Sequence, residues 1–478
     1  MCRLIGWARF QRIGVAVNKL FEPSVQFRGT RAESAPMTWG QGAIWQSIRW
    51  LGDASHYFNI PRVLPLPPGA GLDRVVAAVG ETLSRHEALR TLFHETPDGP
   101  VQQVLAGGTL SIGRSDVPEG RGREAAEEAA AELAGTSFRY GEELPIRCTL
   151  VSEGLRPAYL AIAFAHISVD FRAVQLVEAE MLRLLEGVSD PLPDWQPLDQ
   201  ARHENGATGS ARGSAACDYW RRTLGKVPAP LFAGPPQPTG KDRFVRLRMD
   251  SPAAAVAATM LAGRCQVTTG SVLLAATAAA LASYTGHDTV ALQLIAANRY
   301  NDRERRLIGA MSQNALFVLD LAAGSFEDAA RRTFVAATNA YRFSRYDVNA
   351  MRPVLDRAGA DPDRPVDLSA FFNDARMQDH WEGLPATELA ADELRALAER
   401  TEISFIGSWE RQDAKYFVHT THLPDRCRLY LMADTAFIPV AAMENLLRGI
   451  EKLLVENAIG DLPFNETAAA IGFDSAPA

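Results

Sequence analysis

The sequence has few cysteines, and none of them lie close together. Its 478 residues contain five, with no C-x-x-C pair among them: Cys2, Cys148, Cys217, Cys265 and Cys427. This spacing excludes a cysteine-based zinc knuckle and argues against a disulfide framework. A reducing compartment such as the cytoplasm is therefore the expected location.

Motifs for metals, nucleotides and activated serines are also missing. There is no H-E-x-x-H motif, and the neighbouring His419 and His422 have no carboxylate at ligand spacing. The phosphate-binding patterns G-x-x-x-x-G-K-[ST] and G-x-G-x-x-G do not occur, nor does the G-x-S-x-G nucleophile elbow. We therefore expect no metal site and no cofactor of the protein's own.

Neither the charge nor the hydrophobic pattern points to nucleic acid or to a membrane span. The chain has 49 basic and 57 acidic side chains, a net charge of −8, which argues against sequence-independent nucleic-acid binding. No apolar run reaches the ~18–20 residues that a membrane-spanning helix needs. With 47% hydrophobic residues the chain is expected to be a soluble, folded protein.

The length exceeds what one hydrophobic core usually supports, so two domains are expected. Strand and helix patterns alternate throughout, which indicates an α/β or α+β fold. We predict an N-terminal extension (1–22), an N-terminal lobe (23–186), a linker and crossover region (187–240), a C-terminal lobe (241–460) and a tail (461–478). Within the crossover region, Gly- and Pro-rich stretches are expected on either side of a helix that starts at Cys217. The basic, mildly amphipathic extension is either a poorly ordered leader or a helix at a membrane surface.

Apolar spacing and capping residues define several elements. Alternating side chains predict a strand that ends at His166. A capping box of Ser325 and Asp328 predicts the start of a helix. Further helices are expected over 39–51, 72–86, 271–284 and 439–457, and a strand over 289–297.

The most informative segment joins that buried strand to a following helix, with His166 and Asp170 between them. A histidine held at the end of a rigid strand suits a positioned general base, because imidazole can accept a proton from an amine or hydroxyl near neutral pH. The spacing H-x-x-x-D alone does not decide between that role and a histidine that packs in the core or caps a loop.

This segment resembles the signature H-H-x-x-x-D-G of the condensation domains of nonribosomal peptide synthetases. Here the signature reads Ala165, His166, three intervening residues, Asp170 and Phe171. Other blocks that are similar to the family occur in the expected order: APMTWGQGAIWQSI (35–48), RHEALRTLF (85–93), PIRCTL (145–150), ANRYNDRERRLIGAMSQNALFVLDL (297–321), FFNDAR (371–376) and the closing helix.

The resemblance implies two chloramphenicol-acetyltransferase-like lobes in a V-shaped pseudo-dimer, with a tunnel at their interface. Carrier proteins would present substrates on phosphopantetheine arms, and an amine or hydroxyl acceptor would attack a donor thioester. His166 would be the base or positioning group. Asp170 would support the site through an ion pair with Arg299. Such an enzyme is an acyltransferase of nonribosomal peptide biosynthesis, free-standing or excised from a larger synthetase.

Two departures from the signature keep an alternative open. The family's first histidine is Ala165 here, and its glycine is Phe171. The bulky ring of Phe171 either narrows the acceptor side of the tunnel or marks a catalytically silent domain that recruits partner enzymes to a carrier-bound peptide. An epimerisation domain of the same fold is a third possibility. Other residues expected at the tunnel are Ser168, Ser404 and Asn373.

Overall fold

The computed structural model describes residues 23–361, 365–376, 380–384 and 389–463. The predicted extension at 1–22 and most of the tail lie outside these residues. The chain has a mixed α/β fold with two compact units, described separately below. Unit 1 comprises residues up to Ala35 together with His56–Gln196, and unit 2 comprises Pro36–Ser55 and the rest of the chain from Pro197.

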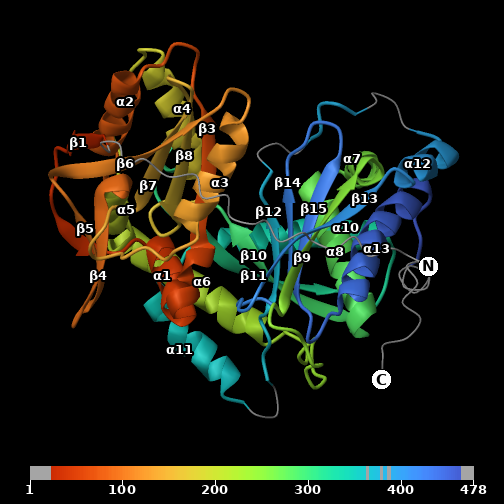
Figure 1. The fold of residues 1–478 in the computed structure, drawn as a ribbon. Helices are drawn as coiled ribbons and strands as arrows, with labels where there is room; N and C mark the ends of the chain where they lie inside the picture. The colour runs from red at the N-terminus through yellow and green to blue at the C-terminus, as the bar shows by residue number, and fades with distance from the viewer. Residues whose placement is uncertain (1–22, 362–364, 377–379, 385–388, 464–478) are drawn as a thin grey trace. The chain divides into compact units, whose positions relative to one another are not determined.

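In the described part of unit 1, a larger and a smaller sheet are accompanied by the α-helices α2, α3 and α4 (Figure 1). The larger sheet has the strand order β1-β6-β7-β8-β3, and the smaller one has the order β2-β5-β4. The strands are β1 (Ser24–Arg28), β2 (Ser34–Pro36), β3 (Asn59–Pro65), β4 (Thr91–Thr96), β5 (Gly99–Val104), β6 (Gly107–Val117), β7 (Ile146–Glu153) and β8 (Arg156–Ala165). The helices are α2 (Leu72–Arg85), α3 (Gly122–Ala134) and α4 (Phe171–Leu185).

Strand β8 is buried on both faces, and its two faces differ in side-chain size. The larger residues Leu160, Ile162 and Phe164 alternate with alanines, as predicted. Helix α3 packs on β3, β7 and β8. Asn59, which pairs with Ala165 on β8, donates from Nδ2 to the carbonyl of Ala134 at the end of α3 (2.9 Å). The alanine face therefore lies toward α3.

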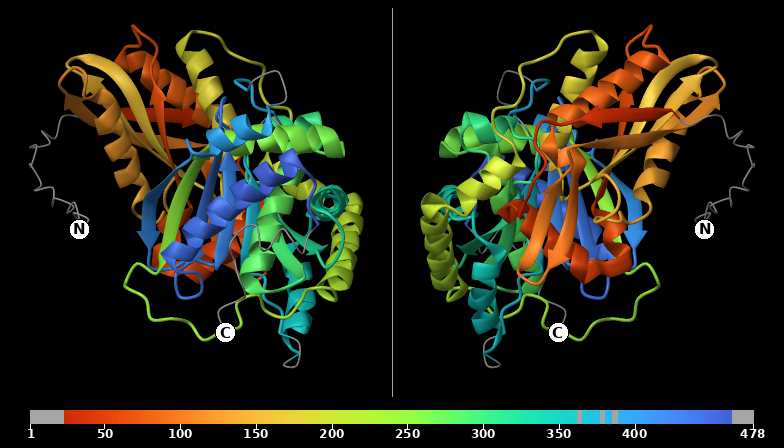
Figure 2. Two further views of the ribbon diagram at one scale, coloured as in Figure 1. Left: turned by 90° about the vertical axis from the view of Figure 1, so that its right-hand side faces the viewer. Right: turned by 90° about the vertical axis from the view of Figure 1, so that its left-hand side faces the viewer.

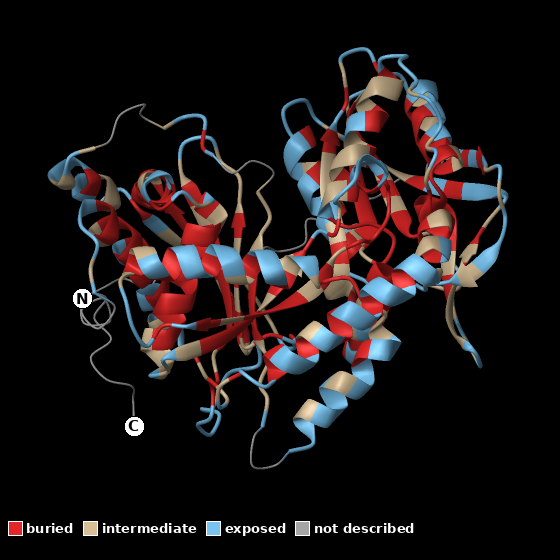
Figure 3. Cartoon of the chain, turned by 180° about the vertical axis from the view of Figure 1, so that it is seen from behind, coloured by how far each residue is buried: buried red, intermediate tan, exposed pale blue. Residues whose placement is uncertain are grey.

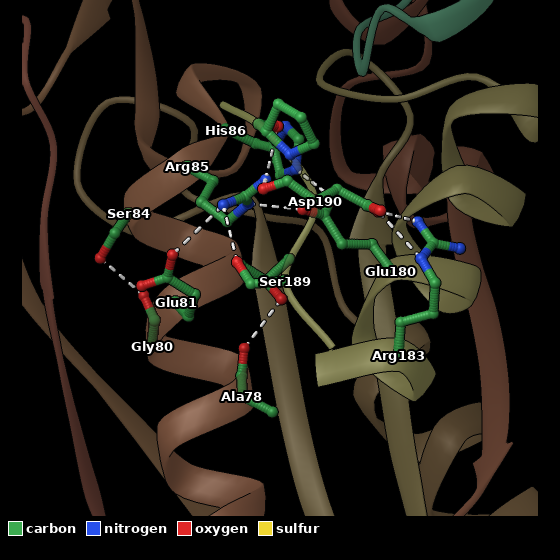
Figure 4. Close-up of polar contacts among 12 residues, drawn as sticks. Ala78, Gly80, Glu81, Ser84, Arg85, His86, Glu180, Arg183, Ser189 and Asp190 are labelled. Atoms are coloured by element: carbon green, nitrogen blue, oxygen red, sulfur yellow. Dashed lines mark hydrogen bonds and ion pairs between the residues drawn. The ribbon is translucent and has the colours of Figure 1, made fainter. Parts of the chain in front are cut away.

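A buried ionic cluster fastens the end of α2 to α4 (Figure 4). Arg85 Nε donates to Glu180 Oε1 (2.5 Å), and the ring of His86 bonds the other oxygen of Glu180. Arg85 Nη2 also donates to the carbonyls of Asp190 and Pro191, both at 2.8 Å. Burial alone would raise the pKa of Glu180, but the hydrogen bonds and charges of His86 and Arg85 together lower it.

Unit 2 is built on one seven-stranded sheet of order β11-β10-β12-β14-β15-β9-β13. Its strands are β9 (Phe244–Ser251), β10 (Thr289–Ala296), β11 (Gln313–Asp320), β12 (Ala370–Asp374), β13 (Glu402–Trp409), β14 (Tyr416–Thr421) and β15 (Cys427–Asp434). Its helices are α1 (Trp39–Leu51), α5 (Pro197–Glu204), α6 (Ala207–Leu224), α7 (Pro252–Cys265), α8 (Thr269–Thr285), α9 (Asp302–Arg306), α10 (Phe326–Arg342), α11 (Val348–Gly359), α12 (Ala391–Ala398) and α13 (Val440–Ile459).

The two faces of this sheet have different neighbours. Helices α7, α8, α10 and α13 cover one face (Figure 2), where a large core contains side chains such as Leu247, Leu294 and Val418. Helix α6 packs against β11 on the other face, through residues such as Trp220 and Leu316. Figure 3 shows that buried residues concentrate in the strands and on the inner faces of the helices.

Within the described residues, no single helix is long and apolar enough to cross a membrane. Helices α7 and α8 reach that length and composition only as a pair bent by 108°. Both helices contribute buried alanines and leucines to the core under the sheet.

The region predicted as linker and crossover (187–240) is more helical than expected, because α5 and α6 occupy residues 197–224 and only the helix from Cys217 was predicted. The glycines that suggested a loop are sites of close packing. A side chain at Gly209 would overlap the backbone of Glu204, and one at Gly213 would meet the ring of Trp39 at 3.2 Å. Small residues in α6 therefore permit close approach of neighbouring elements.

Helix α1 lies within the predicted N-terminal lobe (23–186), but in the structure it belongs to unit 2. The backbone amide of Trp39 donates to Glu204 Oε2 (2.7 Å), and Gly40 lies directly against the backbone of Ala310. Burial raises the pKa of Glu204 to about 7, although its hydrogen bonds with Gln200 and Trp39 favour the carboxylate. The predicted helices over 39–51 and 72–86 and the capping box at Ser325 are present.

Candidate functional site

His166 occupies the first position of the turn after β8, and its side chain is partly exposed. Its Nδ1 bonds the carbonyl oxygen of Val169 (2.9 Å). A carbonyl only accepts, so Nδ1 carries the proton and the lone pair of the neutral imidazole lies on Nε2. The ring of Phe58 packs edge-on against the imidazole at 6.1 Å between centroids. The turn thus fixes both the tautomer and the orientation of the ring.

Asp170 ends the turn and begins helix α4. It is the N-cap residue, and its Oδ1 accepts a hydrogen bond from the backbone amide of Ala173 (2.9 Å). The side chain is buried. A carboxylate at a helix N-terminus also interacts favourably with the helix dipole. Asp170 therefore fixes where the turn ends, which supports the position of His166 four residues earlier.

Phe171 follows at the first position of α4, and 42% of its surface is exposed. Its ring lies 6.0 Å from the guanidinium of Arg62, which forms a two-pronged ion pair with Glu178 on α4 (2.6 and 2.8 Å). The ring is therefore not part of the core of unit 1. The sequence left this orientation undecided.

Ser168 lies in the same turn with its side chain fully buried. Its backbone amide donates to the carbonyl of Ala165 (3.0 Å), but its Oγ has no hydrogen-bond partner among the described residues. A buried hydroxyl without a partner is uncommon, because it loses its hydrogen bonds with water on folding.

Arg299 lies in unit 2, after β10. It donates to three backbone carbonyls, those of Glu304 (2.6 Å), Leu307 (2.7 Å) and Gly309 (2.9 Å). These hydrogen bonds hold the chain around and after α9 close to Arg299. Asp170 lies in unit 1, so an ion pair between Asp170 and Arg299 would join residues of different units, and it stays a prediction.

The remaining two candidates, Asn373 and Ser404, prove to lie in one row across the sheet of unit 2. Strand register pairs Asn373 of β12 with His419 of β14, and His419 with Tyr430 of β15. Tyr430 pairs with Arg248 of β9, which pairs with Ser404 of β13. Directly paired residues share a face, and this face is opposite the one covered by α7 and α13. We call these five side chains the polar row.

Three members of the polar row were not expected from the sequence. In the sequence His419 stands out only because His422 is nearby, and the described residues contain no cluster that could hold a metal ion. The His419 ring stacks on Tyr430, with 4.5 Å between centroids and an angle of 8° between planes. Burial, assisted by the charge of Arg246, lowers the pKa of His419 to about 3. The sequence signal that could have paired His419 with Tyr430 is the alternation of apolar residues in the two strands of the hairpin β14–β15.

Comparison with known proteins places this geometry in a family. The family model described as "Condensation domain" matches residues 32–383, more than two thirds of the chain. This chain belongs to the condensation domain family. The match includes the His166 turn, helix α4, Arg299 and Asn373, whereas His419, Tyr430 and Ser404 lie beyond its end.

The curated relatives that this chain matches include two bacterial peptide synthetases. Phosphinothricin tripeptide synthetase PhsB of Streptomyces viridochromogenes is 29% identical over 316 residues, which cover 63% of this chain and 26% of the relative. The probable non-canonical nonribosomal peptide synthetase CymA of Salinispora arenicola is 26% identical over 294 residues, 58% of this chain and 4% of the relative. The condensation domain thus spans a small part of the relatives that it matches.

Solved structures show the same fold at low sequence identity. The condensation domain of the monacolin K polyketide synthase MokA aligns with a TM-score of 0.71 and 17% identity, covering 90% of this chain and 99% of that one. The X-domain from teicoplanin biosynthesis aligns with a TM-score of 0.69 and 17% identity, covering 92% and 98%. The predicted fold class is confirmed. The V-shaped arrangement with a tunnel remains an expectation from the family.

Proposed function

We propose that this condensation domain is an acyltransferase of nonribosomal peptide biosynthesis, in which His166 is the base. It would join an acyl or aminoacyl thioester, presented on the phosphopantetheine arm of a carrier protein, to an amine or hydroxyl acceptor. The observation that carries the proposal is the hydrogen bond from His166 Nδ1 to the carbonyl of Val169. It leaves Nε2 as the atom that can accept a proton.

In the proposed reaction cycle, His166 accepts one proton and later returns it. Nε2 of His166 accepts a proton from the acceptor amine or hydroxyl, whose lone pair forms a bond with the thioester carbonyl carbon. The tetrahedral intermediate then expels the thiolate of the arm, breaking the carbon–sulfur bond. The imidazolium returns its proton to that thiolate, so His166 ends the cycle neutral. The Val169 carbonyl also stabilises the imidazolium, since Nδ1 keeps its proton throughout.

Replacement of His166 by alanine tests this assignment. Loaded carrier proteins and candidate acceptors are incubated with the parent and with His166→Ala, and product is measured by mass spectrometry. We expect product formation to fall by about 10²-fold or more, the usual scale for a positioned base, with an unchanged melting temperature. His94→Ala is the matched control, since His94 is a partly buried histidine of β4 that bonds Gln103 (2.8 Å). Near-normal turnover by His166→Ala would overturn the assignment.

The departures at Ala165 and Phe171 support a second candidate, a catalytically silent domain that recruits partner enzymes. One similar structure, with a TM-score of 0.69, is titled a complex of the X-domain and OxyB from teicoplanin biosynthesis. This candidate predicts that the parent binds a loaded carrier protein without consuming the thioester. It also predicts that His166→Ala binds as well as the parent.

A further inference from the structure

The polar row is a surface of unusual composition for the middle of a sheet. Five strands each contribute one polar side chain, and at about 4.8 Å per strand the row is roughly 19 Å long. Its members are partly exposed, with 31% exposure for the side chain of Arg248. The adjacent row on the same face is largely apolar and includes Phe371, Phe417 and Met432.

Positive charge is in excess around this row. Asp250 is buried on β9, and both of its oxygens bind Arg428 of β15 (2.6 and 2.8 Å). The nearest contact of Arg248 with the same carboxylate is from Nε to Oδ2, at 3.3 Å, and Asp250 is its one ion-pair partner among the described residues. Two arginines thus share one carboxylate, which leaves the terminal nitrogens of Arg248 available for another anion.

The other charged groups on this face do not reverse that balance. Arg246 of β9 lies over the ring of Trp409 at 4.6 Å, and Glu402 of β13 is paired with Asp250 across the strands. Asp434 of β15 lies on the same face and is already paired with Arg243. Apart from that pair, three arginines of these strands face two carboxylates. His419 adds no charge near neutral pH, since burial keeps its imidazole unprotonated, but that imidazole can still donate one hydrogen bond and accept another.

We propose that the polar row binds an oxyanion of the substrate, with Arg248 as its charged partner and with His419, Tyr430 and Ser404 as hydrogen-bonding neighbours. The chemistry fits the carboxylate of a free amino acid or hydroxy acid acceptor. It also fits the phosphate of a phosphopantetheine arm. Assignment of the anion to the acceptor or to the arm rests on the proposed function, whereas the anion site itself does not.

A binding experiment with matched probes tests the site and separates the two sources. Saturation-transfer NMR compares the common amino acids and their 2-hydroxy acid analogues with the corresponding amides. A second arm compares 4′-phosphopantetheine with pantetheine. In one of the arms we expect the anionic probe to bind the parent at least tenfold more tightly than its neutral counterpart, because hydrogen bonds to charged groups are the stronger ones.

Three variants make the result specific to Arg248. Arg248→Gln should abolish the preference for the anion. Arg248→Lys should retain part of it, because lysine keeps the positive charge but lacks the planar guanidinium that can donate two parallel hydrogen bonds. Arg395→Gln is the matched control, since Arg395 is an exposed arginine of α12 that pairs with Glu456 (2.8 Å). If Arg248→Gln does not fold, the uncharged substitutions Tyr430→Phe and Ser404→Ala should each weaken anion binding.

The outcomes distinguish this inference from the proposed function. An Arg248-dependent preference for anions without any turnover would support the anion site and count against catalysis. Turnover together with a preference that Arg248→Gln leaves unchanged would overturn the anion site. The absence of any anion preference in both arms of the parent experiment would overturn it as well.

Discussion

Two clusters of arginine and carboxylate, one in each unit, differ in how completely their charges are matched. In unit 1, Arg85 is buried and bonds Glu180 through Nε, while Nη2 bonds two backbone carbonyls and Nη1 contacts the side chains of Glu81 and Ser189. In unit 2, Arg248 and Arg428 are partly exposed and share Asp250. In the first cluster the protein itself supplies the partners of the arginine, whereas in the second cluster Arg248 can still bind another anion.

The difference indicates what each cluster does. A buried charge is stable only when its partners are in place, so a saturated cluster holds elements together. A partly exposed arginine with one weak contact contributes little to stability, and its guanidinium can exchange partners. Variants of the unit 1 cluster should therefore affect stability, and variants of Arg248 should affect ligand binding.

Glu180→Gln should have the largest effect on stability. It leaves Arg85 and His86 buried without their anion, and breaking a buried pair in this way costs about 3–5 kcal/mol of unfolding free energy. Denaturant unfolding at pH 7 measures the loss. Glu81→Gln is the control, because the exposed Glu81 contacts Arg85 at 3.4 Å and should change the free energy of unfolding by less than about 1 kcal/mol.

The same cluster predicts that the folding stability falls as the pH is lowered. Since the folded protein lowers the pKa of Glu180, its contribution to stability is present above the pKa of the unfolded chain, about 4.3, and is lost as the pH falls through the lower folded value. The parent should therefore lose stability on acidification below about pH 4.3, and Glu180→Gln should lose less. Parallel acid titrations of the two proteins would contradict the assignment.

Substitutions of Asp170 and Arg299 should have an intermediate effect on the free energy of unfolding. Asparagine is as good an N-cap as aspartate, so Asp170→Asn keeps the cap of α4 and removes the charge. If the predicted ion pair forms, a double-mutant cycle of Asp170→Asn with Arg299→Gln should give a coupling energy of about 0.5–3 kcal/mol. A parent-like melting temperature with lost activity in Asp170→Asn would instead mean that Asp170 acts in catalysis.

Phe171→Gly should have the smallest effect on stability. The ring is 42% exposed, so the main cost is that of a glycine in a helix, about 1 kcal/mol or less. If the ring limits the acceptor, this variant should accept bulkier amines or hydroxyls, measured by competition between acceptors of different size. An unchanged acceptor preference with a marked drop in melting temperature would show that Phe171 acts through packing.

The sequence was sufficient for the part of the candidate site that is local along the chain. Alternation in β8, the signature around His166 and the following apolar spacing specify a strand, a turn and a helix within about 30 residues. The same holds for the cap at Ser325. In each case the determining interactions join residues a few positions apart, and such patterns can be read without knowledge of the fold.

The polar row could not be predicted in the same way, because it depends on strand order. β9 and β15 are far apart in sequence, and only their pairing places Arg248 beside Tyr430. The stretch before Cys217 is helical and not a loop for a related reason, since Gly213 of α6 packs against Trp39, which is distant in sequence. Composition indicated a loop where tertiary contacts stabilise a helix.

The alanine face of β8 has a consequence for how this domain could be changed by evolution or engineering. Ala165 stands where the family's signature has its first histidine, and it is fully buried on the side of α3, with its amide bonded to the carbonyl of Pro145 (3.0 Å). An imidazole there would need space that α3 now fills. A pair of histidines at positions 165 and 166 would therefore need more than one substitution. Residues of α3 would have to become smaller before Ala165→His, so the order in which the substitutions are made decides whether the protein tolerates them.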